Sequence, residues 1–538
     1  MSKVWGSQTS ARSPTQIAWK KIDVHRVLRQ IVDAHEDEAV PLLKGFLSLF
    51  CVLASYFVVL PIRDEAGVAL GTEVLPVLFC LSLLVTLIAT PLAAEFLLRS
   101  DVPRERALRQ LFTLFAGSFV VFFVAYAVFT HAPAGSDLAA REGSWTSSKE
   151  LGKGAGSHPV GRRGVADTQA GRTLLSEGSN HEHATSQALT HAQVLVRAAF
   201  FLWLTVVNLV ALSAVWARLA DVFGSGASKR LFGFLGAGAT CGQLAGSLMA
   251  AMFARMLKAG ALHALPVAGM QACPMLLSAL LLEGAGQAIA TLKPVHASPE
   301  SKMPSSRRQK GCRPQKARAR LWRGVARLLD GFSTIRGSRY LTWLTVYIML
   351  NTTISSLVYF EKSMVVASAA SDSASRMAIF ATINSASALV IAGLQLFATG
   401  FLLTRLKLPA ALAASAAVAA VVMAVIAVHP SPVVVGGGEV IRKVVNYVLT
   451  KPAREALFTV VSPEERYKGK LCMDTVIVRL GDTVAAGLFQ VLAGFLHVGP
   501  SGVALAAFPV CLACASVAYF LGLHHELLAA KQLRQGVS

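Results

Sequence analysis

Five polar or charged side chains recur at helical spacing between residues 432 and 450, within a run rich in valine. Because each residue of an α-helix turns by about 100°, they project within an arc of about 100°, and apolar residues cover the opposite face. A charged side chain at the centre of a bilayer costs about 3 kcal/mol on insertion scales, so this stripe should line a cavity and not face lipid. The stripe consists of Glu439, Arg442, Lys443, Asn446 and Thr450.

A second polar stripe follows in residues 473–496. Its members share one face of a predicted helix, and leucines, valines and an isoleucine form the other face. We expect two neighbouring helices whose charged stripes face each other. The members of this second stripe are Thr475, Arg479, Asp482, Thr483 and Gln490.

Both stripes have an alternative interpretation as ion pairs that only hold the helices together. Glu439 with Lys443 has i,i+4 spacing and Arg479 with Asp482 has i,i+3 spacing, and both spacings suit pairing on a helix surface. That pairing leaves polar groups over, which favours a cavity. The groups left over are Arg442 and Asn446.

The elements that must position these stripes are membrane-spanning helices. Of the 538 residues, 54% are apolar and 15% charged, whereas soluble proteins carry about 25% charged residues. The apolar residues form runs of about the 20 residues that a spanning helix needs. Two sets of six spans are predicted, at 42–62, 74–94, 110–130, 194–218, 231–256 and 264–292, then 340–360, 376–403, 409–428, 432–450, 473–496 and 501–523.

This pattern predicts an all-α polytopic membrane protein, with twelve transmembrane helices in two six-helix halves. The expected organisation has two halves joined by a basic linker, with a segment at each end. The segments are 1–41, a cytoplasmic N-terminal segment; 42–292, the first half; 293–339, a cytoplasmic linker; 340–523, the second half; and 524–538, a cytoplasmic tail.

Basic residues indicate which side of the membrane each connection faces. The linker 293–339 holds thirteen Lys or Arg and two acidic residues. Alternate short connections are also basic, which predicts that they and both termini are cytoplasmic. The span 432–450 is the weakest, because its charges oppose insertion, so eleven spans remain an alternative. We expect a plasma or inner membrane, although residues 1–22 weakly resemble an organellar transit peptide.

Three further segments carry predictions about local structure. Residues 17–32 have apolar residues at helical spacing, which suits an amphipathic helix on the inner membrane surface. The loop 131–193 is rich in Gly, Ser and His and is expected to be disordered. Glycines at every fourth position predict close approach of another helix. These glycines are Gly238, Gly242 and Gly246.

Four strings resemble a known family. KPAREALFTVVSPEERYKGKLCMDTVIVRLGD at 451–482 is similar to the connection between the tenth and eleventh helices of bacterial relatives of the ATP/ADP translocases of plastids and intracellular bacteria. Further similar strings are YFVVLPIRDEAGVALG at 56–71, VWARLADVFGSGASKRLFGFLGAGATCGQLAGS at 215–247 and YFEKSMVVA at 359–367. Members of this family resemble major facilitators in having twelve helices. Characterised members exchange ATP for ADP, or import other nucleotides, without hydrolysing them.

The resemblance implies a nucleotide as the substrate. A nucleotide carries three or four negative charges, so its transporter must meet phosphates with Arg or Lys inside the bundle. The candidate cations are Arg63, Arg442, Lys443 and Arg479. Asn446 lies on the same stripe as Arg442 and Lys443. Glu439 and Asp482 would hold the cations while the cavity is empty.

Two other classes of function stay open at this stage. One is a major-facilitator-like transporter of another anionic or zwitterionic solute. The other is a membrane-embedded enzyme or a scaffold, which is disfavoured because no reacting motif is visible and a scaffold needs no polar stripe. The expected partners are the bilayer and a small anion such as a nucleotide; no nucleic acid, metal, cofactor or catalytic residue is expected.

Overall fold

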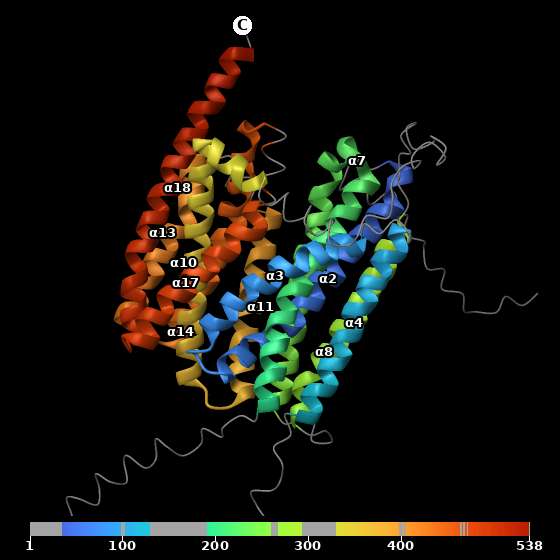
Figure 1. Cartoon of the computed structure of the whole chain (residues 1–538), viewed down its shortest axis with the longest axis vertical. Coiled ribbons are helices and arrows are strands. Elements are labelled where there is room, and N and C mark those ends of the chain that lie inside the picture. Colours follow the sequence, from blue (N-terminus) through green and yellow to red (C-terminus); the bar gives the residue numbers. More distant parts are fainter. Residues whose placement is uncertain are drawn as a thin grey trace, which may run out of the picture.

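The computed structural model of the chain describes residues 35–97, 103–129, 191–259, 267–292, 330–397, 405–462, 469–470 and 472–536, together with Leu402 and Glu465. Long helices that run side by side make up the described residues (Figure 1). In the first part of the chain they are α2 (Glu36–Ala69), α3 (Leu75–Leu97), α4 (Arg104–Phe129), α7 (His191–Lys258) and α8 (Val267–Ala290).

The described second part of the chain contains uninterrupted α-helices and two helical runs with π-helical turns. They are α10 (Arg339–Ala369), α11 (Ser373–Phe397), α13 (Leu408–Val428), α14 (Pro432–Val445) with the π-turn η3 (Asn446–Thr450), α15 (Lys451–Ala456) and the 3₁₀ turn η4 (Leu457–Val460), then η5 (Met473–Ile477), α17 (Val478–Phe489), η6 (Gln490–Phe495) and α18 (Pro500–Gly536).

Eleven helices among the described residues are long and apolar enough to cross a membrane. Each coincides with one of the predicted spans. The remaining predicted span, 432–450, is a continuous helical run from Pro432 to Ala456 that falls outside this set, because Glu439, Arg442 and Lys443 lower its hydropathy. It packs against α10, α11 and α13, so its charged face lies inside the bundle.

The helix labelled α7 contains two of the predicted spans, His191–Phe223 and Leu231–Lys258. A side-chain carbon added at Gly45 of α2 would touch both Leu219 and Leu235, so the two spans lie together there. The spans run in opposite directions along α2. Three glycines of the second span meet α2 as predicted, since Gly238, Gly242 and Gly246 lie against Phe46, Phe50 and Ala54.

Two large hydrophobic cores hold the helices, and each contains residues of the other half. The first core is built mainly from α2, α4, α7 and α8, and it also contains Met377 and Ala381 of α11. The second core is built mainly from α10, α13, η5, α17 and α18, and it contains Leu75, Leu78 and Phe79 of α3 and Phe201 of α7. The halves are therefore joined by α3 packed on α17 and by α11 packed on α7.

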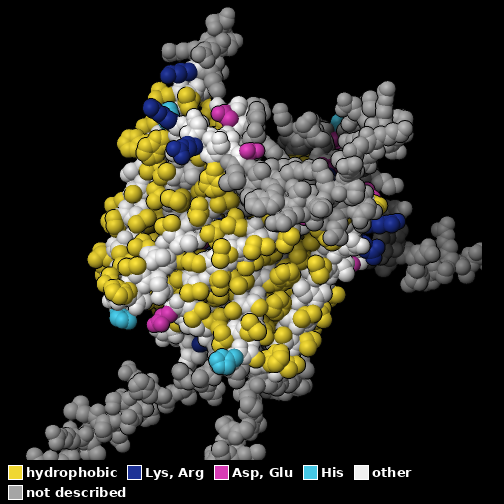
Figure 2. Space-filling model, in the orientation of Figure 1, with side chains coloured by type: hydrophobic (Ala, Val, Ile, Leu, Met, Phe, Trp, Pro, Cys, Tyr) yellow, Lys and Arg dark blue, Asp and Glu magenta, His cyan; other side chains and the backbone are white. Residues whose placement is uncertain are grey.

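The surface of the helices suits a bilayer. In Figure 2 a broad apolar surface covers the middle of the visible face, and Lys and Arg side chains lie towards its upper end. The basic connections meet at that end, where Arg104 pairs with Asp221 and Tyr340 donates a hydrogen bond to the Leu457 carbonyl oxygen. Apolar side chains on the outside and charges at the ends are what a multi-pass membrane protein requires.

Some predicted segments lie outside the described residues, and others have different ends in the structure. The amphipathic helix 17–32, residues 131–190 of the predicted loop and residues 293–329 of the predicted linker lie outside the described residues. The predicted tail 524–538 belongs to α18 as far as Gly536. The helices α2 and α10 continue past the predicted ends of their spans, at 62 and 360, and this extension determines the composition of the site.

Candidate functional site

A cavity of about 210 Å³ lies where α2 and α7 meet α10, α11 and α14. Two helices of the first half and three of the second therefore line it. Its charged lining residues are Arg63, Asp64, Lys362, Glu439 and Lys443, and its polar lining includes Gln243, Ser355, Asn384, Tyr359 and Tyr447.

Asp64 of α2 is contacted by polar and charged side chains from both halves. Its Oδ1 accepts a hydrogen bond from the Tyr359 hydroxyl at 3.1 Å and lies 3.4 Å from Arg63 Nη1. Its Oδ2 lies 3.9 Å from Nζ of Lys362. Asp64 and Lys362 are each about 2% exposed. One buried carboxylate thus serves two cations, one from its own helix and one from α10.

Glu439 of α14 has the same relation to two other cations. Its Oε2 accepts a hydrogen bond from Nε of Arg442 at 2.9 Å and lies 2.8 Å from Nη2, and its Oε1 lies 3.3 Å from Nζ of Lys443. Both cations also reach outwards: Arg442 Nη1 donates to Ser355 Oγ, and Lys443 Nζ donates to Asn384 Oδ1.

The site carries a surplus of positive charge. Arg63 and Lys362 share Asp64, and Arg442 and Lys443 share Glu439, so four cations meet two carboxylates. A charge buried without a counter-charge is costly, and an anion bound between these groups would remove that cost. The electrostatics of the cavity therefore favour a ligand with two or more negative charges.

Two hydrogen-bond donors beside the cavity have no acceptor among the described residues. Arg63 Nε and Asn384 Nδ2 are buried and make no hydrogen bond with the described residues. Both residues line the cavity. Buried donors are satisfied in nearly all proteins, so an unmade bond at a cavity indicates a ligand acceptor or water.

Aromatic rings orient the two cations that are shared by Asp64. The guanidinium of Arg63 lies over the Phe201 ring, 4.0 Å from its centroid. Nζ of Lys362 lies 4.8 Å from the Tyr359 centroid and 5.2 Å from the Phe380 centroid. Such contacts contribute about 0.5–2 kcal/mol each and hold the cations without neutralising them.

A second cavity of about 570 Å³ adjoins the first on the side of the basic connections, where it reaches Lys451 and Glu455. The two cavities share four lining residues, which therefore lie between them: Tyr56, Phe57, Gln243 and Tyr447. The second cavity also has Trp216, Asn208, Thr240 and Gln395 in its wall. Asn208 Oδ1 is buried and accepts no hydrogen bond from the described residues.

The opposite end of the 210 Å³ cavity is closed by an ion pair and an apolar contact. Arg376 of α11 pairs with Glu65 of α2 at 3.1 Å. Val68, Val366 and Phe380, from α2, α10 and α11, form a small buried cluster of their own. The structure is therefore closed on the side away from the basic connections.

The structure brings three of the sequence-predicted site residues, Arg63, Glu439 and Lys443, to the lining of one cavity. Arg442 does not line the cavity but pairs with Glu439, one helical turn before it. The expectation from spacing that Arg442 has no ion-pair partner is therefore corrected. Asn446 is half-buried and does not belong to the lining of either cavity.

The expected facing of the two charged stripes is wrong, because α10 lies between them. Ser355 contacts Arg442 of α14, whereas the next residue, Ser356, donates to Asp482 of α17 at 2.6 Å. Arg479 Nη1 is 3.0 Å from Asp482 Oδ2 and does not line the 210 Å³ cavity. The Arg479–Asp482 pair therefore has the geometry of the alternative interpretation, an internal ion pair.

The sequence analysis does not find Lys362 and Asp64, because the spans predicted at 42–62 and 340–360 end before them. The signal that pointed to them was present in the strings YFEKSMVVA and YFVVLPIRDEAGVALG, which hold both residues. The helices α10 and α2 carry these charges into the bundle because each continues for several residues past them.

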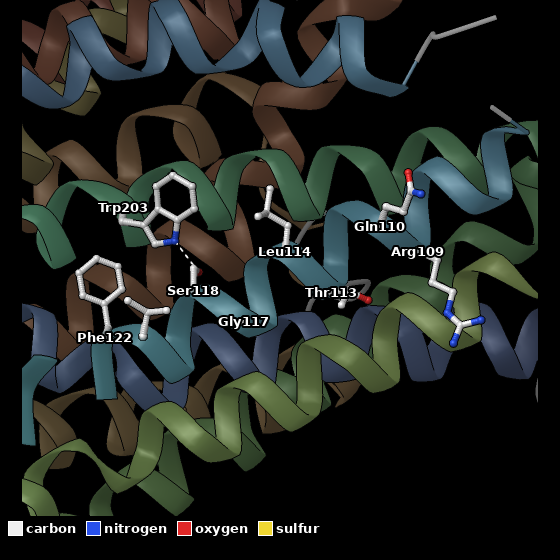
Figure 3. Close-up of a pocket in the computed structure, with 9 residues that line it drawn as sticks. Arg109, Gln110, Thr113, Leu114, Gly117, Ser118, Phe122 and Trp203 are labelled. Atoms are coloured by element: carbon white, nitrogen blue, oxygen red, sulfur yellow. Dashed lines mark hydrogen bonds between the residues drawn. The ribbon is translucent and has the colours of Figure 1, made fainter. Parts of the chain in front are cut away.

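A larger hollow, of about 800 Å³, lies on the outside of the bundle along α4 beside Trp203 of α7 (Figure 3). Its wall is largely apolar and includes the exposed Leu114 and Val121. Trp203 Nε1 donates to Ser118 Oγ at 2.7 Å. Such a lining is suited to lipid acyl chains, so the smaller, charged cavity between the halves is the candidate site.

No family model matches the chain, and no curated protein matches it in sequence. The structure is similar to a D-xylose–proton symporter, with a TM-score of 0.50 and 12% identity over 90% of this chain and 96% of that one. It is also similar to a mutant of the nucleoside transporter NupG (TM-score 0.49, 13% identity, 90% of this chain and 99% of that one). A POT family transporter in complex with a thioalcohol-conjugated peptide gives a TM-score of 0.49 and 10% identity, over 91% of this chain and 96% of that one.

The likeness to the symporter shows the fold. The chain has the all-α, major-facilitator-like fold expected from the sequence, with eleven apolar spans and the charged helical run Pro432–Ala456 among the described residues. The helical run of α14, η3 and α15 is the tenth of the predicted spans in chain order, and its charges exclude it from the eleven apolar spans. The resemblance to the ATP/ADP translocases stays a prediction.

Proposed function

We propose that this protein is a membrane transporter that moves a multiply charged organic anion, most simply a nucleotide, through the cavity between its halves. The observation that carries the proposal is the meeting of four cations with two carboxylates at the boundary of the halves. Phosphates of a nucleotide supply the missing negative charge, and guanidinium and ammonium groups are the side chains that bind them.

The second cavity supports a nucleotide over a simpler anion. It adjoins the cationic cavity, and its wall combines aromatic rings with carboxamides, including Tyr447, Trp216, Asn208 and Gln395. Aromatic faces stack on bases, and carboxamides hydrogen-bond base edges. A nucleotide with phosphates at Arg63, Lys362 and Lys443 would extend its base towards Asn208, whose Oδ1 lacks a donor.

Transport would proceed by alternating access, in which the halves rock around the central cavity. Asp64 and Glu439 come from different halves and hold their cations while the site is empty. A phosphate that engages both cation pairs links the halves, so the loaded and empty proteins differ in the free energy of the transition. Exchange of ATP for ADP, or net uptake, are both compatible with this cycle.

The runner-up is a zwitterionic solute. Asp64 and Glu439 line the same cavity as the cations, so an ammonium group on the substrate would find a carboxylate there. The volume of the first cavity, about 210 Å³, is also sufficient for a small amphoteric molecule. Competition experiments with both classes of solute separate the two proposals.

Uptake of labelled ATP and ADP into proteoliposomes, with and without ADP inside, tests the proposal. We expect saturable uptake that internal ADP accelerates, because in an exchanger the site carries one nucleotide inward and another outward in each cycle. An excess of unlabelled nucleotide should abolish uptake, and an amino acid or peptide should not. Uptake that is indifferent to every nucleotide would rule out the nucleotide proposal, and competition by a zwitterion would establish the alternative.

A further inference from the structure

Glu361 of α10 carries a completely buried carboxyl group. Its exposed fraction is 0%, and neither Oε1 nor Oε2 makes a hydrogen bond with the described residues. The next residue, Lys362, lines the cationic cavity. Since each residue of an α-helix turns by about 100°, Glu361 points well away from the cavity, towards the core of the second half.

The charged groups on the helices around α10 are engaged with one another. Among the described residues, α13 has no charged residue from Leu408 to Val428, and the titratable side chains of α18 in the bundle are Cys511, Cys514 and Tyr519, followed by His524, His525 and Glu526 near the basic connections. The other helices present pairs: Arg63 and Lys362 with Asp64, Arg376 with Glu65, Arg442 and Lys443 with Glu439, Arg479 with Asp482, and Arg454 with Asp474.

An ionised Glu361 would therefore stand alone in a dry core. Burial of an isolated carboxylate costs several kcal/mol even after relaxation, whereas a protonated carboxyl is a small polar group. Ionisable groups inside membrane bundles commonly carry protons through a transport cycle. Glu361 is adjacent in sequence to a cation of the binding site, so a movement of α10 that repositions Lys362 also moves Glu361.

We propose that Glu361 is a proton-binding site that couples substrate movement to a proton, so that net uptake is a symport of anion and H⁺. The inference rests on the proposed transport function and adds its coupling ion. In the form described here the buried carboxyl holds its proton. Release of the proton to water on the inner side leaves a carboxylate, which takes up a proton from the outer side before the next substrate enters. Each cycle thus moves one proton inward without other chemistry.

Infrared spectroscopy of the reconstituted protein tests the proton site without any substrate. We expect a carboxylic-acid C=O band at neutral pH that shifts in D₂O and that disappears in Glu361→Gln. Asp64→Asn serves as the control, because Asp64 is paired with cations and contributes no such band. A carboxylic-acid band that persists unchanged in Glu361→Gln would overturn the proposal.

A transport measurement then tests coupling. With the outside of the proteoliposomes acidic, wild-type protein should accumulate nucleotide above the level reached without a gradient, and a trapped pH dye should report proton entry. Glu361→Gln, which mimics the protonated form, should keep ATP/ADP exchange and lose the gradient-driven accumulation. Ser368→Ala, a conservative change near the end of the same helix, should keep both.

The two proposals fail in different ways. Gradient-driven accumulation at the wild-type level in Glu361→Gln refutes proton coupling at Glu361 and leaves nucleotide transport intact. Absence of any nucleotide uptake by the wild-type protein refutes the nucleotide proposal, while the infrared band still decides whether Glu361 holds a proton.

Discussion

Lys362 Nζ lies 3.9 Å from Asp64 Oδ2, and the two residues belong to different halves of the chain. Both are almost completely buried. A pair that joins the halves at the cavity must change when the halves rock, so it links occupancy of the site to conformation. The variants that follow separate residues that contact substrate from residues that hold the bundle.

Replacement of Lys362 by Gln should weaken uptake of the anion and leave the folded protein in the membrane. One charge-assisted hydrogen bond contributes about 1.5–3 kcal/mol, so we expect KM to rise by about 10- to 100-fold. Lys44→Gln is the matched control, because Lys44 contacts Thr291 away from the cavity. Equal effects of the two variants in proteoliposome uptake would contradict a substrate contact at Lys362.

Arg479 and Asp482 should behave as a unit. Arg479→Gln leaves Asp482 buried with Ser356 as its remaining partner, which should lower thermal stability and transport together. The double variant with Asp482→Asn leaves no unpaired charge, and it should recover both properties. If transport stays lost in a double variant of normal stability, Arg479 contacts substrate as the sequence predicted.

The pair of Glu65 and Arg376 should hold the outer side closed. Arg376→Gln leaves a buried carboxylate in the closed form at a cost of about 3–5 kcal/mol, whereas water reaches Glu65 once the halves separate. The outward-open population should therefore rise. Labelling of Val366→Cys by an impermeant thiol reagent, in a Cys-depleted background, should become faster. It should slow again when Glu65→Gln is added, and labelling that ignores both changes would argue against this closure.

Gly246 should be intolerant of a side chain. A Cβ there would lie 2.5 Å from the Ala54 carbonyl oxygen of α2, so the helices must move apart. We expect Gly246→Ala to lower stability by about 1–3 kcal/mol, as overpacked cores do. Gly233→Ala on the same helix meets nothing within 4 Å and should be neutral or gain about 1 kcal/mol from helix propensity. Thermal unfolding in detergent compares the two, and an equal response would show that close packing at Gly246 is unimportant.

The positions of the spans could be predicted because long apolar runs have few alternatives in a membrane protein. Their ends could not, because charged residues were taken as boundaries. Lys362 and Asp64 lie inside helices that continue to Ala369 and Ala69, where opposite charges from another helix compensate them. A partner far away in the chain leaves no mark on local hydropathy.

The direction of side chains along the helix that begins at Pro432 was the second feature that could not be predicted in full. The π-turn η3 accommodates an extra residue per turn, so the 100° rule fails beyond Val445. Tyr447 consequently lines both cavities, and Thr450, predicted on the polar stripe, donates to the Ala411 carbonyl oxygen of α13. The packing of α3 on the second core and of α11 on the first core could not be predicted either. Both helices are apolar around most of their circumference, so the sequence does not show which side packs against which core.

Equilibrium binding of labelled ATP to the purified protein tests the cationic cavity most directly. Wild-type protein and Lys44→Gln should bind with equal affinity, and binding should weaken as salt rises. The double variant Lys362→Gln with Lys443→Gln removes both ammonium groups from the cavity, and it should lose binding while it stays folded. Unchanged ATP affinity in this double variant, or the absence of binding by the wild-type protein, would contradict the account.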